Sequence, residues 1–224
     1  MLPVTLMFFP LIIPLIYCAI WKKESFERVL VLSLIAFSMV VAYQVVIYLE
    51  DKLSYYGYFL GKLIVFTAIP LIAISYFEKW SIRDALTRFG IRKEGMGKSI
   101  ILGIGALVIT LLLGLIALWG QNAHVSLSWN AIMFLDAFNE EFLFRGVLIL
   151  YLWKITDIKV AYATSIVSYM IVHPQHYASL FMISTIAQGI LLAIIAHKTK
   201  NIIGPWISHG LNRVLLQIIR AILF

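Results

Sequence analysis

Residues 99–120 read SIILGIGALVITLLLGLIALWG and contain no Asp, Glu, Lys or Arg. A helix rises about 1.5 Å per residue, so a run of this length spans the hydrocarbon core of a bilayer, which is about 30 Å thick. The run therefore predicts a helix that crosses a membrane.

Similar apolar runs fill the rest of the chain. Of its 224 residues, 62% are hydrophobic and 13% are charged, whereas roughly 25% are charged in an ordinary soluble domain. Backbone polar groups inside a bilayer must be paired internally, and these runs lack the alternation of barrel strands, so helices are expected. We expect an all-α, polytopic transmembrane bundle, one integral membrane domain over 1–224, with eight spans at 2–21, 29–49, 56–77, 99–120, 131–153, 160–173, 178–196 and 202–224.

Basic residues gather in the connectors after the first, third, fifth and seventh predicted spans, and the opposite connectors hold only Lys52. Cytoplasmic connectors carry the excess of Lys and Arg, so we expect both termini on the outer side. The blocks are short and separated, which favours a topology signal over a nucleic-acid-binding surface as the source of the net charge of +7. The basic connectors contain Lys22, Lys23, Arg28, Lys79, Arg83, Arg88, Arg92, Lys93, Lys98, Lys154, Lys159, Lys198 and Lys200.

Four charged residues lie in the fifth span, Asp136, Glu140, Glu141 and Arg145. A charge at the bilayer centre costs roughly 2.5 to 3.5 kcal/mol, so each needs a partner or a function. Residues four apart share a helix face, so Glu141 meets Arg145 as an ion pair, and Glu140 shares a side with Asp136. Asp136 lies nearer the outer end, where a solvated rim position is an equal alternative. Glu140 has no cation on its own helix, which suits a general base.

Histidines extend this polar set. His173 closes the sixth span, and His209 lies in the eighth, followed within one turn by Asn212 and Arg213. A lone membrane histidine commonly serves packing or hydrogen bonding, but together with Glu140 these residues predict a polar catalytic cavity within the bundle. The other three histidines lie in connectors, where we expect solvated side chains: His124, His176 and His197.

Three short motifs connect these residues. Residues 140–146 read EEFLFRG and fit the pattern EExxxR, residues 169–173 read YMIVH, an aromatic-xxx-His pattern, and residues 208–212 read SHGLN. Together they resemble the CPBP family, which contains CAAX proteases and bacteriocin-processing enzymes and whose last motif is HxxxN or HxxxD. Here Arg213 holds the final position and Asn212 precedes it, but both lie on nearly the same helix face. The resemblance covers about 134–216, within an expected catalytic core at about 131–224.

The resemblance implies an eight-helix intramembrane glutamic endopeptidase that hydrolyses a peptide bond of a membrane-associated protein or peptide. It implies that Glu140, assisted by His173, activates a water molecule, while His209 and Asn212 stabilise the oxyanion. We expect no cofactor, and the lipid bilayer and the substrate as the only partners. We expect an integral, multi-pass membrane protein. It would lie in the cytoplasmic membrane of a prokaryote or in the endoplasmic reticulum of a eukaryote. The supporting residues are Glu141, Arg145 and Arg213.

Other interpretations stay open from the sequence. Glu140, His173 and His209 can hold zinc in a metalloprotease. The displaced Asn212 favours a noncatalytic immunity or scaffold protein on the same fold. A proton-coupled carrier also buries acids and histidines, but the sequence has no interrupted helices in matching halves. Prenylated proteins, leader-bearing peptides and membrane-anchored regulators all suit a cavity that is open to lipid.

A depth comparison raises one conflict. Counted from the cytoplasmic ends of the spans, Glu140 and His173 lie about 20 Å deep, whereas His209 lies only about 10 Å deep. A bend at Gly204 and Pro205, or an eighth span that begins near His197, would bring the three together.

Overall fold

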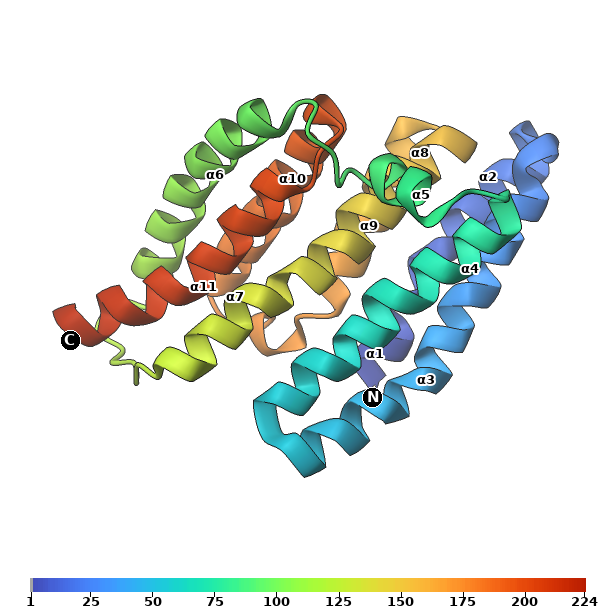
Figure 1. Ribbon diagram of the computed structural model, residues 1–224. Helices are drawn as coiled ribbons and strands as arrows, with labels where there is room; N and C mark the ends of the chain where they lie inside the picture. The colour runs from blue at the N-terminus through green and yellow to red at the C-terminus, as the bar shows by residue number, and fades with distance from the viewer. Residues whose placement is uncertain (1) are drawn as a thin grey trace.

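The computed structural model describes residues 2–224, and this part of the chain is helical and contains no strand. The helices form a bundle (Figure 1), which confirms the all-α prediction. In chain order the α-helices and π-helices are α1 (Leu2–Leu6), α2 (Ile12–Trp21), α3 (Phe26–Lys62), the π-helix η3 (Leu63–Ala68), α4 (Ile69–Glu78), α5 (Ile82–Arg88), α6 (Met96–Ala117), α7 (Leu127–Glu141), the π-helix η4 (Phe142–Tyr151), α8 (Leu152–Ile155), α9 (Ile158–Ile171), α10 (Phe181–Thr199) and α11 (Ile203–Leu223).

Four helical stretches are long and apolar enough to cross a membrane: Pro3–Trp21, Lys23–Glu78, Met96–Ala117 and Phe181–Thr199. The outer face of α6 is apolar and not covered by other helices. Ile101 and Ile116 on this face are 71% and 67% exposed. Soluble proteins rarely expose a continuous apolar face of this kind. The protein is therefore an integral membrane protein whose outer helices face lipid.

The second and third predicted spans meet in a tight hairpin. Ser54, inside the stretch assigned to α3, has a φ of 55° and a ψ of −140°, and the chain turns back there. After the turn, the backbone at Gly57 and Gly61 packs directly against Leu49 and Val46, where an added Cβ would collide with backbone atoms. The two glycines therefore permit close contact between helices, as small residues do in membranes.

The fifth predicted span is one continuous helical rod made of α7, η4 and α8. Ser126 caps its start by accepting a hydrogen bond from the Trp129 backbone N–H. All ten residues of the π-helix η4 are buried, and the Ser165 hydroxyl of α9 donates to the Phe144 carbonyl within it. The rod runs among the other helices of the bundle (Figure 1). Four of its charged residues are buried, namely Asp136, Glu140, Glu141 and Arg145.

The start of α11 resolves the depth conflict. The Ile202 backbone N–H donates to the Gly90 carbonyl at 3.0 Å, and Gly90 packs against Leu150, five residues before α8 ends. The turn before α11 therefore lies inside the bundle at the depth of Leu150, beneath the connector after α5. The proposed earlier start near His197 is wrong, because α10 continues to Thr199. Pro205 lies in the first turn of α11, where its missing N–H breaks no helical bond.

Candidate active site

A cluster of buried charges joins three helices. Lys62, at the end of α3, places its Nζ 2.6 Å from Asp136 Oδ2 and 2.7 Å from Glu140 Oε1. Arg213 of α11 places Nη2 2.7 Å from Glu140 Oε1 and Nη1 3.2 Å from Asp136 Oδ2. Both carboxylates thus share the same two cations. Asp136 is fully buried rather than at a solvated rim.

Lys62 is the functional-site residue that the sequence analysis missed. It lies within the third predicted span, where averaging over apolar neighbours hides one lysine. Its side chain is only 2% exposed, and its ammonium lies 4.8 Å from the centre of the Tyr58 ring. A lysine six residues into an apolar run is the signal that could have identified it, because such a charge requires a partner.

The neighbouring pair has its own partners. Arg145 Nε lies 3.1 Å from Glu141 Oε2, and both side chains are fully buried, which confirms the predicted ion pair. The Arg145 guanidinium also lies 4.5 Å from the centre of the Tyr169 ring. Three carboxylates therefore face three cations, and the cluster is electrically balanced, as buried charges require. The carboxylates are Asp136, Glu140 and Glu141, and the cations are Lys62, Arg145 and Arg213.

The two predicted histidines converge on Glu140. Its Oε2 lies 3.7 Å from His173 Nε2 and 3.8 Å from His209 Nε2, and this buried oxygen has no hydrogen-bond partner among residues 2–224. These distances are too long for direct hydrogen bonds but allow a bridging water. The structure therefore brings together three residues that lie on three separate helical segments or their ends.

The other nitrogen of each ring fixes the histidine orientations. His173 Nδ1 donates to the Tyr169 carbonyl at 2.8 Å, and His209 Nδ1 donates to Glu141 Oε1 at 2.8 Å. In the neutral state, each Nε2 is therefore the unprotonated nitrogen and turns its lone pair toward Glu140. The hydrogen bonds to the Tyr169 carbonyl and to Glu141 thus fix the orientation of the two rings.

Asn212 and Arg213 occupy different positions in the third motif. Arg213 is bound to Glu140 and Asp136. Asn212 is 5% exposed, and its Oδ1 has no hydrogen-bond partner in the described chain. Its amide is therefore free of the charge cluster, whereas the guanidinium of Arg213 is held within it.

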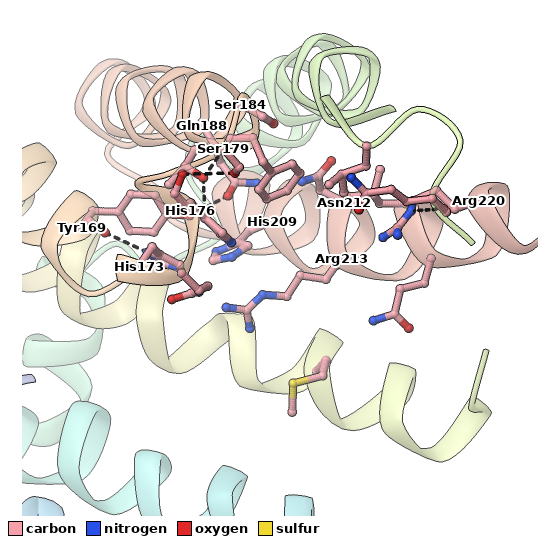
Figure 2. Close-up of a pocket in the computed structure, with 18 of the residues that line it drawn as sticks. Tyr169, His173, His176, Ser179, Ser184, Gln188, His209, Asn212, Arg213 and Arg220 are labelled. Atoms are coloured by element: carbon pink, nitrogen blue, oxygen red, sulfur yellow. Dashed lines mark hydrogen bonds between the residues drawn. The ribbon is translucent and has the colours of Figure 1, made fainter. Parts of the chain in front are cut away.

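A cavity of about 540 Å³ lies beside these residues. Figure 2 shows His209, Asn212 and Arg213 on one side, with His173 and His176 approaching from the chain after α9. His176, which we expected to be a solvated connector residue, is half-buried here, and its Nδ1 lies 2.7 Å from the Thr185 hydroxyl. The cavity wall extends to the connectors after α6 and α9 through Leu118, Gln121, Gln175 and Ser179.

The remaining histidines lie away from the cavity. His124 is exposed in the connector before α7, as expected. His197 is half-buried on α10, with its Nδ1 3.1 Å from the Tyr162 hydroxyl and its ring packed edge-on against Trp153. Across residues 2–224, no group of three or more His, Cys, Asp and Glu side chains is arranged to hold a metal ion.

Comparison with known proteins bears on the segment that carries this site. Neither a curated protein nor a solved structure matches the chain. Residues 122–215, a little under half of the chain, match a family model described as Type II CAAX prenyl endopeptidase Rce1-like. The description of that family names an endopeptidase, and the matched segment contains Glu140, His173, His209 and Asn212. The match confirms the resemblance to the CPBP family of CAAX-type intramembrane proteases that the three motifs indicated.

Proposed function

We propose that this protein is an intramembrane endopeptidase that hydrolyses a peptide bond of a membrane-associated protein or peptide with a water molecule activated by Glu140. The observation that supports it best is the unpartnered Glu140 Oε2, which faces the Nε2 atoms of His173 and His209. A water molecule between Glu140 Oε2 and His173 Nε2 can donate a hydrogen bond to each, which turns its lone pairs toward a substrate carbonyl.

The chemical step then follows from these positions. The water oxygen bonds to the carbonyl carbon, the proton it releases moves to Glu140 Oε2, and the carbonyl oxygen becomes an oxyanion. Glu140 returns this proton to the leaving amine when the carbon–nitrogen bond breaks. His209 donates to the oxyanion from Nε2 when its ring is protonated, because Nδ1 already donates to Glu141. The Asn212 side-chain amide is the second donor.

In this proposal, Arg213 positions Glu140 and does not bind the oxyanion. Its two contacts with Glu140 and Asp136 leave it poorly placed to complete the third motif as an oxyanion donor. Together with Lys62, it fixes Oε1 of Glu140 so that Oε2 turns toward the histidines. Asn212 therefore takes the role that the family motif gives to its last residue.

The same contacts favour a second candidate, a noncatalytic bundle that binds a partner through its polar interior. A general base with two cations on one oxygen is a weaker proton acceptor than a free carboxylate. Such a protein would capture a membrane peptide without cutting it.

Cleavage of a membrane-presented peptide library by the full chain in lipid separates the candidates. We expect peptide products whose yield is unchanged by a chelator, because the proposed chemistry uses only side chains and water. Loss of cleavage with chelator and its return with zinc would instead favour the metalloprotease alternative. Peptides that are retained but never cut would favour the noncatalytic bundle.

The direction of substrate entry follows from the cavity and the connector charges together. The connectors that reach the cavity, after α6 and α9, lie on the side opposite the basic connectors. If the basic connectors are cytoplasmic, both termini are outside and the cavity opens to the outer side of the membrane. The substrate is then a peptide or protein segment that reaches the site from that side.

Cysteine labelling in intact cells tests this orientation. His124 and Lys93 are exposed and lie in connectors on opposite sides, and the natural Cys18 is buried. We expect a membrane-impermeant maleimide to label a His124→Cys variant and to leave Lys93→Cys unlabelled until the cells are opened. The reverse labelling pattern would place the cavity mouth in the cytoplasm.

A further inference from the structure

A second cavity, of about 300 Å³, lies away from the candidate active site and is lined by four cationic side chains: Arg88, Arg92, Lys154 and Lys200. They come from three parts of the chain, namely the end of α5 with the turn after it, α8, and the turn between α10 and α11. Figure 1 shows α5 and α8 at the same end of the bundle. No carboxylate lines the cavity, and within residues 2–224 none forms an ion pair with these four cations.

Among the described residues, the charges in this cavity have no carboxylate partner. Arg92 Nε is buried and has no hydrogen-bond partner among the described residues. Burial, followed by the charges of Lys154 and Arg92, lowers the pKa of Lys200 to about 8. Cations brought together without an anion repel one another, so the arrangement requires either a bound anion or a structural reason.

Buried contacts hold the walls of the cavity in place. Asn201 is fully buried, and its side-chain amide donates to the Arg92 carbonyl at 2.6 Å and to the Glu94 carbonyl at 3.3 Å. These bonds fix the turn that carries Arg92 against the turn that carries Lys200. The Lys200 ammonium lies 3.6 Å from the centre of the Trp153 ring, another cavity residue. Arg92 and Lys200 are therefore carried on turns that are fixed against each other.

We propose that this cavity binds the phosphate group of an anionic phospholipid headgroup. Arginine and lysine together are suited to phosphate, because the guanidinium forms paired hydrogen bonds and the ammonium supplies a compact charge. The cavity lies among the basic connectors at the ends of membrane helices, where basic pockets meet anionic headgroups. The Trp153 ring in its wall suits the same interfacial depth. The proposal does not depend on the proposed protease activity.

The test compares two charge-matched double variants of the full chain in micelles of an uncharged maltoside detergent, which contains no phosphate. Arg92→Gln with Lys200→Gln removes two cations from the cavity. Lys79→Gln with Lys98→Gln removes two cations outside the cavity, one after α4 and one in the first turn of α6. Lys79 follows its helix with a left-handed backbone, as Lys200 does. The rise in Tm is followed during titration with phosphatidylglycerol, and separately with glycerol 3-phosphate.

We expect saturable stabilisation of the wild type and of the Lys79 and Lys98 variant by phosphatidylglycerol, with half-saturation about 30-fold weaker in the Arg92 and Lys200 variant. An Arg92→Lys, Lys200→Arg variant keeps the charges and should bind nearly as the wild type does, which excludes misfolding as the cause. Equal weakening in both glutamine variants, or no stabilisation of the wild type, would overturn the proposal. An equal response to glycerol 3-phosphate would overturn the lipid assignment in favour of a soluble phosphate ester.

Discussion

Replacing Lys62 with methionine is expected to lower the free energy of unfolding by about 3–5 kcal/mol, the usual cost of removing one partner from a buried ion cluster. The change leaves Asp136 and Glu140 with Arg213 as their only shared cation, so the cluster carries an uncompensated negative charge. Methionine fills a similar volume, so the loss reports on charge more than on packing. The measurement is unfolding of the purified chain by SDS in mixed micelles, followed by circular dichroism.

Two further variants make this result specific. Lys52→Met removes an exposed lysine whose partner Asp51 is also exposed, and it should change stability by less than about 1 kcal/mol. Lys62→Met combined with Asp136→Asn restores the charge balance and should recover much of the lost stability. If Lys62→Met changes the free energy of unfolding no more than Lys52→Met does, the buried cluster does not stabilise the fold.

The helical architecture was predictable because hydropathy and length are local properties of the sequence. The eight apolar runs correspond to helices, and even the short sixth run has its counterpart in α9. Pairing along one helix was predictable for the same reason, since Glu141 and Arg145 are four residues apart and meet as expected. Glu140 and Glu141 point in different directions and have largely different partners.

Contacts between helices were harder to predict from the sequence. Lys62 meets Asp136 and Glu140 only because two distant helices pack side by side, and no spacing along the chain encodes that contact. The depth of His209 was misjudged because span boundaries drawn from hydropathy assume that every helix reaches the membrane surface. The turn before α11 instead lies inside the bundle. The π-helix η4 also breaks the 3.6-residue period on which face assignments rest.

Glu140→Gln is expected to reduce kcat by roughly 10²–10⁴-fold, the range that general-base catalysis contributes. The amide has nearly the same shape, and its oxygen can still accept hydrogen bonds from Lys62 and Arg213. Its nitrogen or oxygen cannot take a proton from water at neutral pH. Neutralising Glu140 leaves Lys62 and Arg213 with Asp136 as their only shared carboxylate, so the variant should also lose stability, and kcat is therefore compared on the folded protein.

Glu78→Gln provides the matched control. Glu78 is another largely buried carboxylate, with its side chain 7% exposed, and it accepts a hydrogen bond from Tyr151 and pairs with Arg28. It lies outside the charge cluster and does not line the 540 Å³ cavity. Its replacement removes the same charge without touching the proposed chemistry, so kcat should stay close to the wild-type value.

The most direct measurement is the cleavage rate of one membrane-presented peptide, identified as a wild-type substrate, by purified wild type, Glu78→Gln and Glu140→Gln at matched helix content. The account predicts equal product formation by the first two proteins and a loss of at least about a hundredfold in the third. Cleavage by Glu140→Gln at the wild-type rate would contradict the assignment of Glu140 as the base that activates water.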